Sequence, residues 1–342
     1  MKILRKPPIR LTRAMAIATV AALFALLASS PATASSDGGD VVVANRGSGD
    51  ISVVDVDTLA IAGYDLPGDA EPMYVSHDSR HNQVLVGDRA SSTIVALDDE
   101  TYDVIGSVDV GAGVFHQWLD VDREQLWVVG TAASTVSVVD THDLSQIVTF
   151  QLPADVIADG GVPHDVFVSN NVAFVSVLGL AGGDGLVIQY STMTFDETGR
   201  ITTGADPHLF VQANKLFVAS QAGSSVSKYH ATTLEPKGSI DLPSAHGLFV
   251  TNRNEVFATN ITGGGIDAVW QLDKNLSGVI DTADTSFPVP HNLTVDDSRQ
   301  LWVTHSGGTA NQVSVVSITE NGFGSPTSVT VGTNPFGLAF VD

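Results

Sequence analysis

The chain of 342 residues contains no cysteine. No disulfide can therefore hold the fold together, and its stability must come from burial of a hydrophobic core. The absence also excludes cysteine-ligated centres, namely iron–sulfur clusters, blue-copper sites and covalently attached c-type haem.

Lysine and arginine are scarce, with 16 of them against 38 aspartates and glutamates. Five of the 16 lie within the first 13 residues, so residues 35–342 hold 11 basic and 38 acidic residues, a net charge of −27 with neutral histidines. Such a charge repels phosphate backbones and anionic lipid headgroups. We expect neither nucleic acid nor a membrane surface as a partner, and the sequence does not identify a protein partner or a small-molecule substrate.

Long apolar runs are also absent, with one exception near the N-terminus. Residues 14–28 are apolar, follow the five basic residues and precede the small-residue sequence Ala32-Thr33-Ala34, a pattern typical of an export signal. The run of about 15 residues is shorter than the roughly 20 that a membrane-spanning helix needs. We predict that residues 1–34 are a cleaved signal peptide, that residues 35–342 form one domain without membrane insertion, and that the protein is periplasmic or secreted.

An internal repeat of about 44 residues fills the rest of the chain. Residues 126–129, 216–219 and 301–304 occupy one repeat position as a strand, and a second alternating run such as residues 135–140 follows after a Gly/Ser turn. A third strand and a Gly- or Pro-led opening strand complete the period. Four strands per period make one propeller blade.

Seven opening strands are expected, near residues 71, 114, 163, 207, 245, 290 and 334. The last one ends the chain, while residues 41–66 supply three strands without an opening strand. We therefore predict an all-β fold, a seven-bladed β-propeller of four-stranded blades. Its ring is closed by N- and C-terminal strands in one blade, which leaves no exposed sheet edge there.

The repeat resembles a known family. Val43-Ala44-Asn45, the run Gly47-Ser48-Gly49-Asp50-Ile51 and the opening sequence Asn334-Pro335-Phe336-Gly337 are similar to the YVTN or YncE-like propeller repeat. The resemblance covers essentially all of residues 35–342. It implies the fold but not one function, because propellers of this type include binding proteins, lactonases, lyases and copper enzymes.

Histidines mark the opening strands. Five of the ten stand at or beside the start of one: His116, His164, His208, His246 and His291. Opening strands line the central channel of a propeller, so we expect these imidazoles at one mouth of it. Several neutral imidazoles around an open position suit copper, zinc or iron.

Register decides how many of these histidines can converge, because a slip of one residue turns a side chain to the other face. His164, His246 and His291 stand in one register relative to the apolar residues that follow, whereas His208 is one residue nearer and His116 one residue further. His305, at the end of a second strand, is expected near His291. We predict a transition-metal site built from His164, His246, His291 and His305, with His208 and His116 as further candidates, and copper favoured over zinc or iron.

Several interpretations of the pattern remain open. The histidines can belong to the repeat consensus and bond a neighbouring blade's backbone. With a metal bound, the chain is a metal-dependent oxidoreductase, or a lyase or lactonase similar to streptogramin lyase, with a histidine base, a divalent cation and Glu71 or Asp88 as acidic ligands. A non-catalytic binding or cell-surface propeller is the third alternative.

Two further features are interpreted as structural. Residues 273–284 match the calcium-loop spacing, but they occupy a repeat position where Asp and Asn make turns, and their neighbours are predicted strands. His77 and His81 flank a turn and are expected to be solvated, while His142 and His230 fall in or before outer turns.

Overall fold

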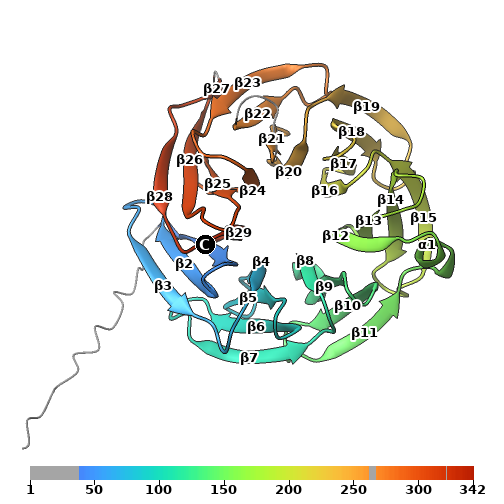
Figure 1. Ribbon diagram of the computed structural model, residues 1–342, viewed down its shortest axis with the longest axis horizontal. Helices are drawn as coiled ribbons and strands as arrows, with labels where there is room; N and C mark the ends of the chain where they lie inside the picture. The colour runs from blue at the N-terminus through green and yellow to red at the C-terminus, as the bar shows by residue number, and fades with distance from the viewer. Residues whose placement is uncertain (1–37, 262–266, 321) are drawn as a thin grey trace, which may run out of the picture. The chain divides into compact units, whose positions relative to one another are not determined.

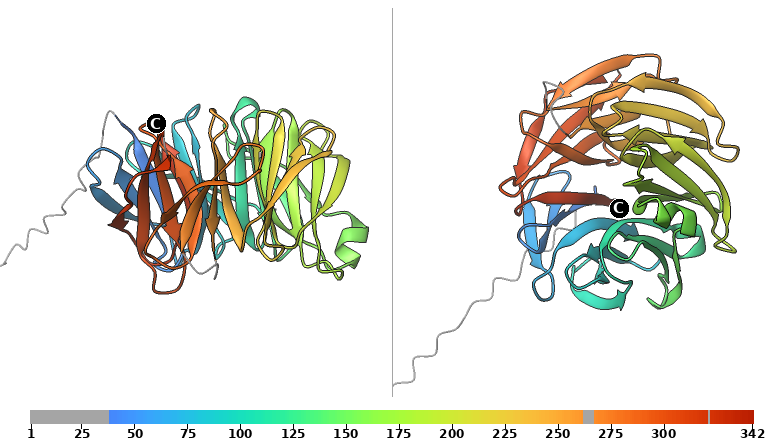
Figure 2. Two further views of the ribbon diagram at one scale, coloured as in Figure 1. Left: turned by 90° about the horizontal axis from the view of Figure 1, so that it is seen from above. Right: turned by 45° about the vertical axis from the view of Figure 1, so that its right-hand side comes forward.

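The computed structural model describes residues 38–261, 267–320 and 322–342, and the predicted signal peptide lies outside them. Seven antiparallel sheets surround a central channel, which confirms the predicted seven-bladed β-propeller (Figure 1). Seen from the side, their strands run between the two faces of the ring (Figure 2). Among the described residues, no helix has the length and apolarity that crossing a bilayer requires.

The innermost strand of each sheet lines the channel. These opening strands are β4 (Pro72–Asp78), β8 (Val114–Asp120), β12 (Val162–Ser169), β16 (Pro207–Gln212), β20 (Ala245–Val250), β24 (Pro290–Val295) and β29 (Pro335–Val341).

The second strand of each blade pairs antiparallel with the opening strand. These second strands are β5 (Gln83–Asp88), β9 (Gln125–Gly130), β13 (Val172–Leu178), β17 (Lys215–Ser220), β21 (Val256–Asn260), β25 (Gln300–His305) and β1 (Asp40–Asn45). The third strands are β6 (Thr93–Asp98), β10 (Thr135–Asp140), β14 (Gly185–Ser191), β18 (Ser225–His230), β22 (Ala268–Leu272), β26 (Gln312–Thr319) and β2 (Asp50–Asp55).

The outermost strands complete the blades. They are β7 (Val104–Asp109), β11 (Gln146–Gln151), β15 (Glu197–Thr203), β19 (Pro236–Asp241), β23 (Val279–Asp284), β28 (Thr327–Thr330) and β3 (Ile61–Asp65). Three short elements are additions that the repeat did not predict: the 3-10 helix η1 (Val121–Arg123), the helix α1 (Ala154–Ala158) and the strand β27 (Gly322–Phe323).

The ring closes as predicted. β29, the last strand of the chain, pairs with β1, the first described strand, and the sheet order is β29-β1-β2-β3. Figure 1 shows the blue N-terminal strands beside the red C-terminal ones. Backbone hydrogen bonds between the two ends therefore hold the circle shut.

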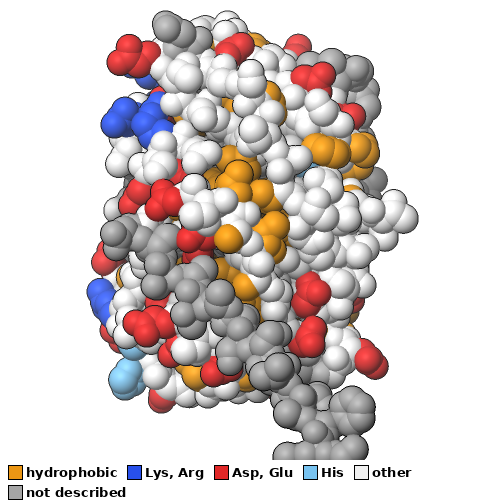
Figure 3. All heavy atoms as spheres, turned by 90° about the vertical axis from the view of Figure 1, so that its left-hand side faces the viewer, with side chains coloured by type: hydrophobic (Ala, Val, Ile, Leu, Met, Phe, Trp, Pro, Cys, Tyr) orange, Lys and Arg blue, Asp and Glu red, His pale blue; other side chains and the backbone are white. Residues whose placement is uncertain are grey.

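Burial falls from the inner strands to the outer ones. β5 is buried along its whole length because neighbouring blades cover both of its faces, whereas the outer β7 alternates between exposed and half-buried residues. Trp127 and Trp302 are fully buried in the layers between blades. On the outer surface over β3 and β28, acidic side chains outnumber basic ones, in keeping with the net charge (Figure 3).

Six of the seven opening strands carry a β-bulge at their start. In β12 the pairing steps from Pro163 to Val166 across only two partner positions, and β20 and β24 show the same shift. β16 pairs without interruption. A bulge inserts one residue and re-aims the side chains beside it, so the bulge decides which residue of an opening strand turns toward the channel mouth.

Candidate metal centre

Each opening strand contributes one ring to a closed circle around the channel. Neighbouring ring centroids in this circle are 3.7–5.5 Å apart. We call this circle the collar; in blade order it comprises Tyr74, His116, His164, His208, His246, His291 and Phe336. The five histidines that the sequence placed at opening strands thus do lie together.

The register difference among these histidines has a structural reason. His164, His246 and His291 occupy the first bulge position of their strands, whereas His116 occupies the second, because Phe115 takes the first. β16 has no bulge and so lacks one residue after His208. The bulge therefore compensates for the shifts, and all five imidazoles reach the collar.

Side-chain hydroxyls stabilise the bulges and link the blades. Thr259 Oγ1 accepts the backbone N–H of Gly247 at 2.8 Å and donates to the carbonyl of His291 in the next blade at 2.6 Å. Thr304 Oγ1 repeats this arrangement between Asn292 and Phe336. These hydroxyls form hydrogen bonds with backbone groups that have no partner in the sheet because of the bulge. They also fix the position of each histidine relative to its neighbour.

Burial keeps four of the collar imidazoles neutral. It lowers the pKa of His164 and of His291 to about 3, and it holds the pKa values of His208 and His246 well below the ordinary value of a histidine. Neighbouring imidazoles add to the effect, because two adjacent imidazolium charges would repel each other. Neutral imidazole is the form that donates a lone pair to a metal.

Two of the imidazoles are oriented by a polar side chain of a neighbouring blade, and a third, His291, has Asn292 Nδ2 at 2.9 Å from its Nδ1. His116 Nδ1 lies 2.9 Å from Asp165 Oδ1, and His246 Nδ1 lies 2.8 Å from Gln221 Oε1. A partner on one ring nitrogen fixes the ring and leaves the other nitrogen available. The Nε2 atoms of both histidines are buried and have no hydrogen-bond partner among the described residues.

Unpartnered polar atoms gather at one place on the collar. Besides the two Nε2 atoms above, they include His164 Nδ1, Asp206 Oδ1 and His208 Nε2, all buried and without a hydrogen-bond partner among the described residues. Asp206 Oδ1 lies 3.7 Å from each of the other two. Donors about 2.1 Å from one tetrahedral ion are about 3.4 Å apart, so these three atoms need only a small adjustment to share a cation.

Asp206 itself lies just before the opening strand β16. Its backbone has a positive φ of 57°, and burial raises the pKa of its carboxyl. A cation bound beside it would favour the charged carboxylate. The buried histidine and aspartate groups could therefore hold a metal ion.

A second combination of buried groups, His116, Asp165 and His208, also brings three donor atoms within 4.8 Å of one another. The Asp165 carboxylate, however, already accepts the backbone N–H groups of Val166 and Leu209 as well as pairing with His116. It therefore serves better as a fixed partner of His116 than as a metal ligand.

His305 lies apart from the collar. Its Nδ1 is 3.1 Å from the carbonyl of Pro288 and its Nε2 is 2.8 Å from Ser314 Oγ, so both ring nitrogens have partners. The residue stands opposite Pro290 on β25, which explains its expected nearness to His291. We do not include it in the ligand set considered below.

The segment resembling a calcium loop forms a turn between β22 and β23. Asp273 Oδ1 accepts the backbone N–H of Asn275 at 2.9 Å and the hydroxyl of Ser277 at 2.8 Å. Strands, not helices, flank it, as predicted.

Below the collar the channel opens into a cavity of about 400 Å³. The collar residues Tyr74, His116, His208 and His246 line its inner end, and its outer end reaches Val121 and Asp342 at the far ends of the opening strands. On the opposite side of the collar, Phe115 contacts Tyr74, His116, His164 and Phe336. Of the residues with unpartnered atoms on the collar, His116, His208 and His246 line the inner end of this cavity, whereas His164 and Asp206 do not line it.

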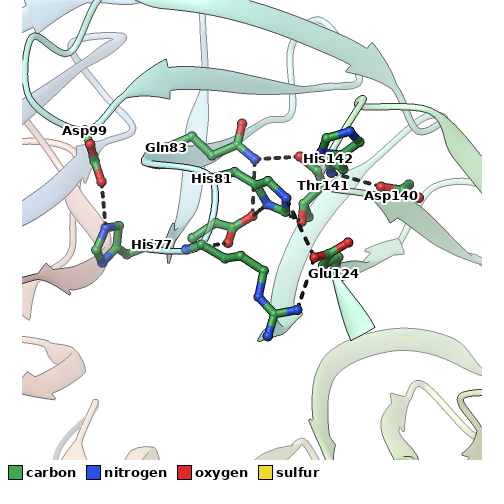
Figure 4. A network of polar contacts seen from close by, with 10 residues as sticks. His77, His81, Gln83, Asp99, Glu124, Asp140, Thr141 and His142 are labelled. Atoms are coloured by element: carbon green, nitrogen blue, oxygen red, sulfur yellow. Dashed lines mark hydrogen bonds and ion pairs between the residues drawn. The ribbon is translucent and has the colours of Figure 1, made fainter. Parts of the chain in front are cut away.

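A polar network lies toward the far mouth, where the expectation of solvated histidines was wrong. His77 Nε2 is 3.0 Å from Asp99 Oδ2 and its Nδ1 is 3.3 Å from Asp342, the last residue. His81 lies beside Thr141 and Glu124 and bonds Asp78 through Nδ1 at 2.8 Å (Figure 4). Both side chains are largely buried, with exposed fractions of 7% and 17%. Sequence reasoning missed the partners of His77, because Asp99 and Asp342 are distant in the sequence, whereas Asp78 lies only three residues before His81.

Comparison with known proteins supports the fold alone. No family model matches the chain, no curated protein matches it, and the YVTN family is not confirmed. A Lactobacillus plantarum protein superimposes with a TM-score of 0.73 at 15% identity, covering 89% of this chain and 100% of its own. A Bacteroides fragilis protein assigned as a 6-phosphogluconolactonase gives 0.72 at 14% identity, covering 90% and 99%. Hydrazine synthase of Kuenenia stuttgartiensis gives 0.65 at 14% identity, covering 80% and 90%.

Proposed function

We propose that the protein binds a transition metal on the collar through His164 Nδ1, Asp206 Oδ1 and His208 Nε2. The observation that carries the proposal is the set of buried, unpartnered polar atoms at this one place. Leaving a buried polar group unpaired costs about 1–3 kcal/mol, and a cation would satisfy several such groups at once. His116 Nε2 and His246 Nε2 could complete its coordination, since their rings lie 5.8 Å and 3.7 Å from the His208 ring between centroids.

Two imidazoles and one carboxylate suit several metals, including zinc and iron. Copper is favoured because Cu²⁺ binds a given set of nitrogen and oxygen ligands more tightly than its divalent neighbours do. A coordination position facing the cavity would admit substrate, and with copper the protein would be a metal-dependent oxidoreductase. We also propose that the propeller acts outside the cytoplasm, as residues 1–34 predict; N-terminal sequencing of the secreted protein tests this.

A second candidate function is metal-assisted lactone hydrolysis or lyase chemistry. The observation that favours it is the His116–Asp165 pair, in which the carboxylate holds Nδ1 and leaves Nε2 as a general base beside the proposed metal. One fold neighbour is assigned as a lactonase. In lactone hydrolysis, His116 would take a proton from the water molecule that attacks a metal-bound carbonyl. Glu71, which the sequence predicts as an acidic ligand, instead pairs with Arg46 at 2.5 Å.

Elemental analysis of protein purified without a histidine tag tests the proposal. We expect about one transition metal per chain, and loss of at least tenfold in copper affinity in His164→Ala and His208→Ala. His142→Ala and His230→Ala, which change histidines in or before outer turns, serve as matched controls. A copper EPR signal with nitrogen coupling separates the redox centre from a zinc hydrolase. Absence of tight metal binding, or equal losses in the controls, would refute the proposal.

A further inference from the structure

The cavity below the collar has a continuous aromatic wall. Trp118 stacks on Phe167 with centroids 3.6 Å apart, Phe167 lies 4.8 Å from Phe210, and Phe210 lies 5.1 Å from Phe249. All four line the cavity. Such a wall, shared by four consecutive blades, offers the flat faces against which an aromatic ring packs in offset or edge-on geometry.

The rest of the lining combines aliphatic and polar side chains. Leu293 and Leu338 line the cavity from other blades, and Gln117 and Thr294 are among the polar residues. Gln117 donates to the carbonyl of Leu85 at 2.8 Å and to Ser76 Oγ at 3.2 Å. Its amide N–H groups are therefore engaged within the protein, whereas its Oε1 is buried without a hydrogen-bond partner among the described residues. The main unpaired donor sites for a ligand lie at the collar, at the inner end.

Charge also limits the ligand. No lysine or arginine stands among the described residues that line the cavity, and Asp342 lies at its outer end. With a net charge of −27 on residues 35–342, a carboxylate or phosphate ligand would be repelled and would find no lysine or arginine in the channel wall. The cavity volume of about 400 Å³ lies in the range of small-molecule sites.

We infer that this cavity binds an uncharged aromatic small molecule with a nitrogen or oxygen donor at one end. Its ring lies against the Trp118–Phe249 wall, and its donor reaches the metal on the collar. The contact between the ligand's donor atom and the metal rests on the metal site proposed above, whereas the binding of the aromatic ring rests on the cavity alone. The ligand enters from the far mouth, because the rings of Phe115 and the collar occupy the other end.

Two matched probes separate these parts. 4-Phenylimidazole carries a free nitrogen donor, while 1-phenylpyrrole has nearly the same shape without an available lone pair in the ring plane. At pH 8 we expect both to bind metal-free protein with similar affinity and to change the fluorescence of Trp118, and copper loading to tighten only 4-phenylimidazole, by tenfold or more. Calorimetry gives the affinities.

A cavity-filling variant locates the site. Ala339 lines the cavity, so Ala339→Phe should weaken both probes at least tenfold while leaving copper binding intact; Ile280→Phe, on an exposed outer strand, is the control. If no probe saturates, or if Ala339→Phe binds as wild type does, the inference is overturned. If the probes bind but copper does not, the proposed metal site and the donor–metal contact are both wrong, and the aromatic site remains. If copper raises the affinity of both probes equally, only the donor–metal contact is refuted.

Discussion

Acidification should unfold the metal-free protein at a mildly acidic pH because of the collar. His164 and His291 are neutral in the folded protein down to a pKa of about 3, whereas in the unfolded chain a histidine takes up a proton near pH 6.5. Below pH 6.5 the unfolded state therefore binds more protons than the folded state. Stability is full above about pH 7 and falls as the pH drops toward 3.

The size of the effect follows from linkage. One proton of difference changes the free energy of unfolding by about 1.4 kcal/mol per pH unit, so the two imidazoles together remove about 4 kcal/mol between pH 6.5 and 5. His208 and His246, whose pKa values are also lowered by burial, add in the same direction. Domains of this kind are stable by about 5–15 kcal/mol. We expect a steep loss of stability between pH 6 and 4.5.

Urea unfolding of metal-stripped protein at half-unit pH steps from 8 to 4.5 measures this slope. His291→Phe should flatten it by about 1.4 kcal/mol per pH unit below pH 6, because one titrating group is gone, while His142→Gln, at an exposed turn, should leave it unchanged. A free energy of unfolding that stays constant between pH 7 and 5 would show that the collar imidazoles are protonated or solvated in the folded protein.

Three other predictions concern the fold. Deleting residues 333–342 removes the strand that closes the ring, and we expect the melting temperature to fall by about 10 °C or more; an unchanged value in calorimetry would contradict closure by β29. Thr259→Val should lower the free energy of unfolding by about 2–4 kcal/mol, because two buried backbone groups lose their partner. Urea unfolding measures this with Thr259→Ser as the control, and equal stabilities of the two variants would contradict it. Asp273→Ala should leave the melting temperature unchanged with and without calcium, and a calcium-dependent rise lost in the variant would show a real calcium site.

The fold could be predicted because its information is local and repeated. Each blade shows the same strand, turn and opening signals, so an error in one period is corrected by the other six. The two ends of the chain each hold only part of a blade, so the prediction of a closed ring followed from combining them into one blade. The additions α1 and β27 could not be foreseen, since they occur once and carry no periodic signal.

The site was only partly visible in the sequence. Five histidines were found from their place in the repeat. Strict register ranks His116 and His208 below the others, yet all five imidazoles reach the collar, because a bulge is not readable from alternation alone. Asp206 was missed although it directly precedes Pro207-His208. Its backbone takes a left-handed conformation, which the sequence alone does not predict for an Asp.

The proposed metal site on the collar depends on the blades that depart from the repeat. Seven identical histidines would place equivalent nitrogens all around the channel, with no position preferred. Instead, Tyr74 and Phe336 from neighbouring blades form an aromatic arc, and the five histidines form a continuous polar arc opposite. Within that arc only β16 lacks a bulge, and it is preceded by Asp206, whose Oδ1 is buried. The repeat thus supplies the circle, and the exception at β16 concentrates donor atoms at one point on it.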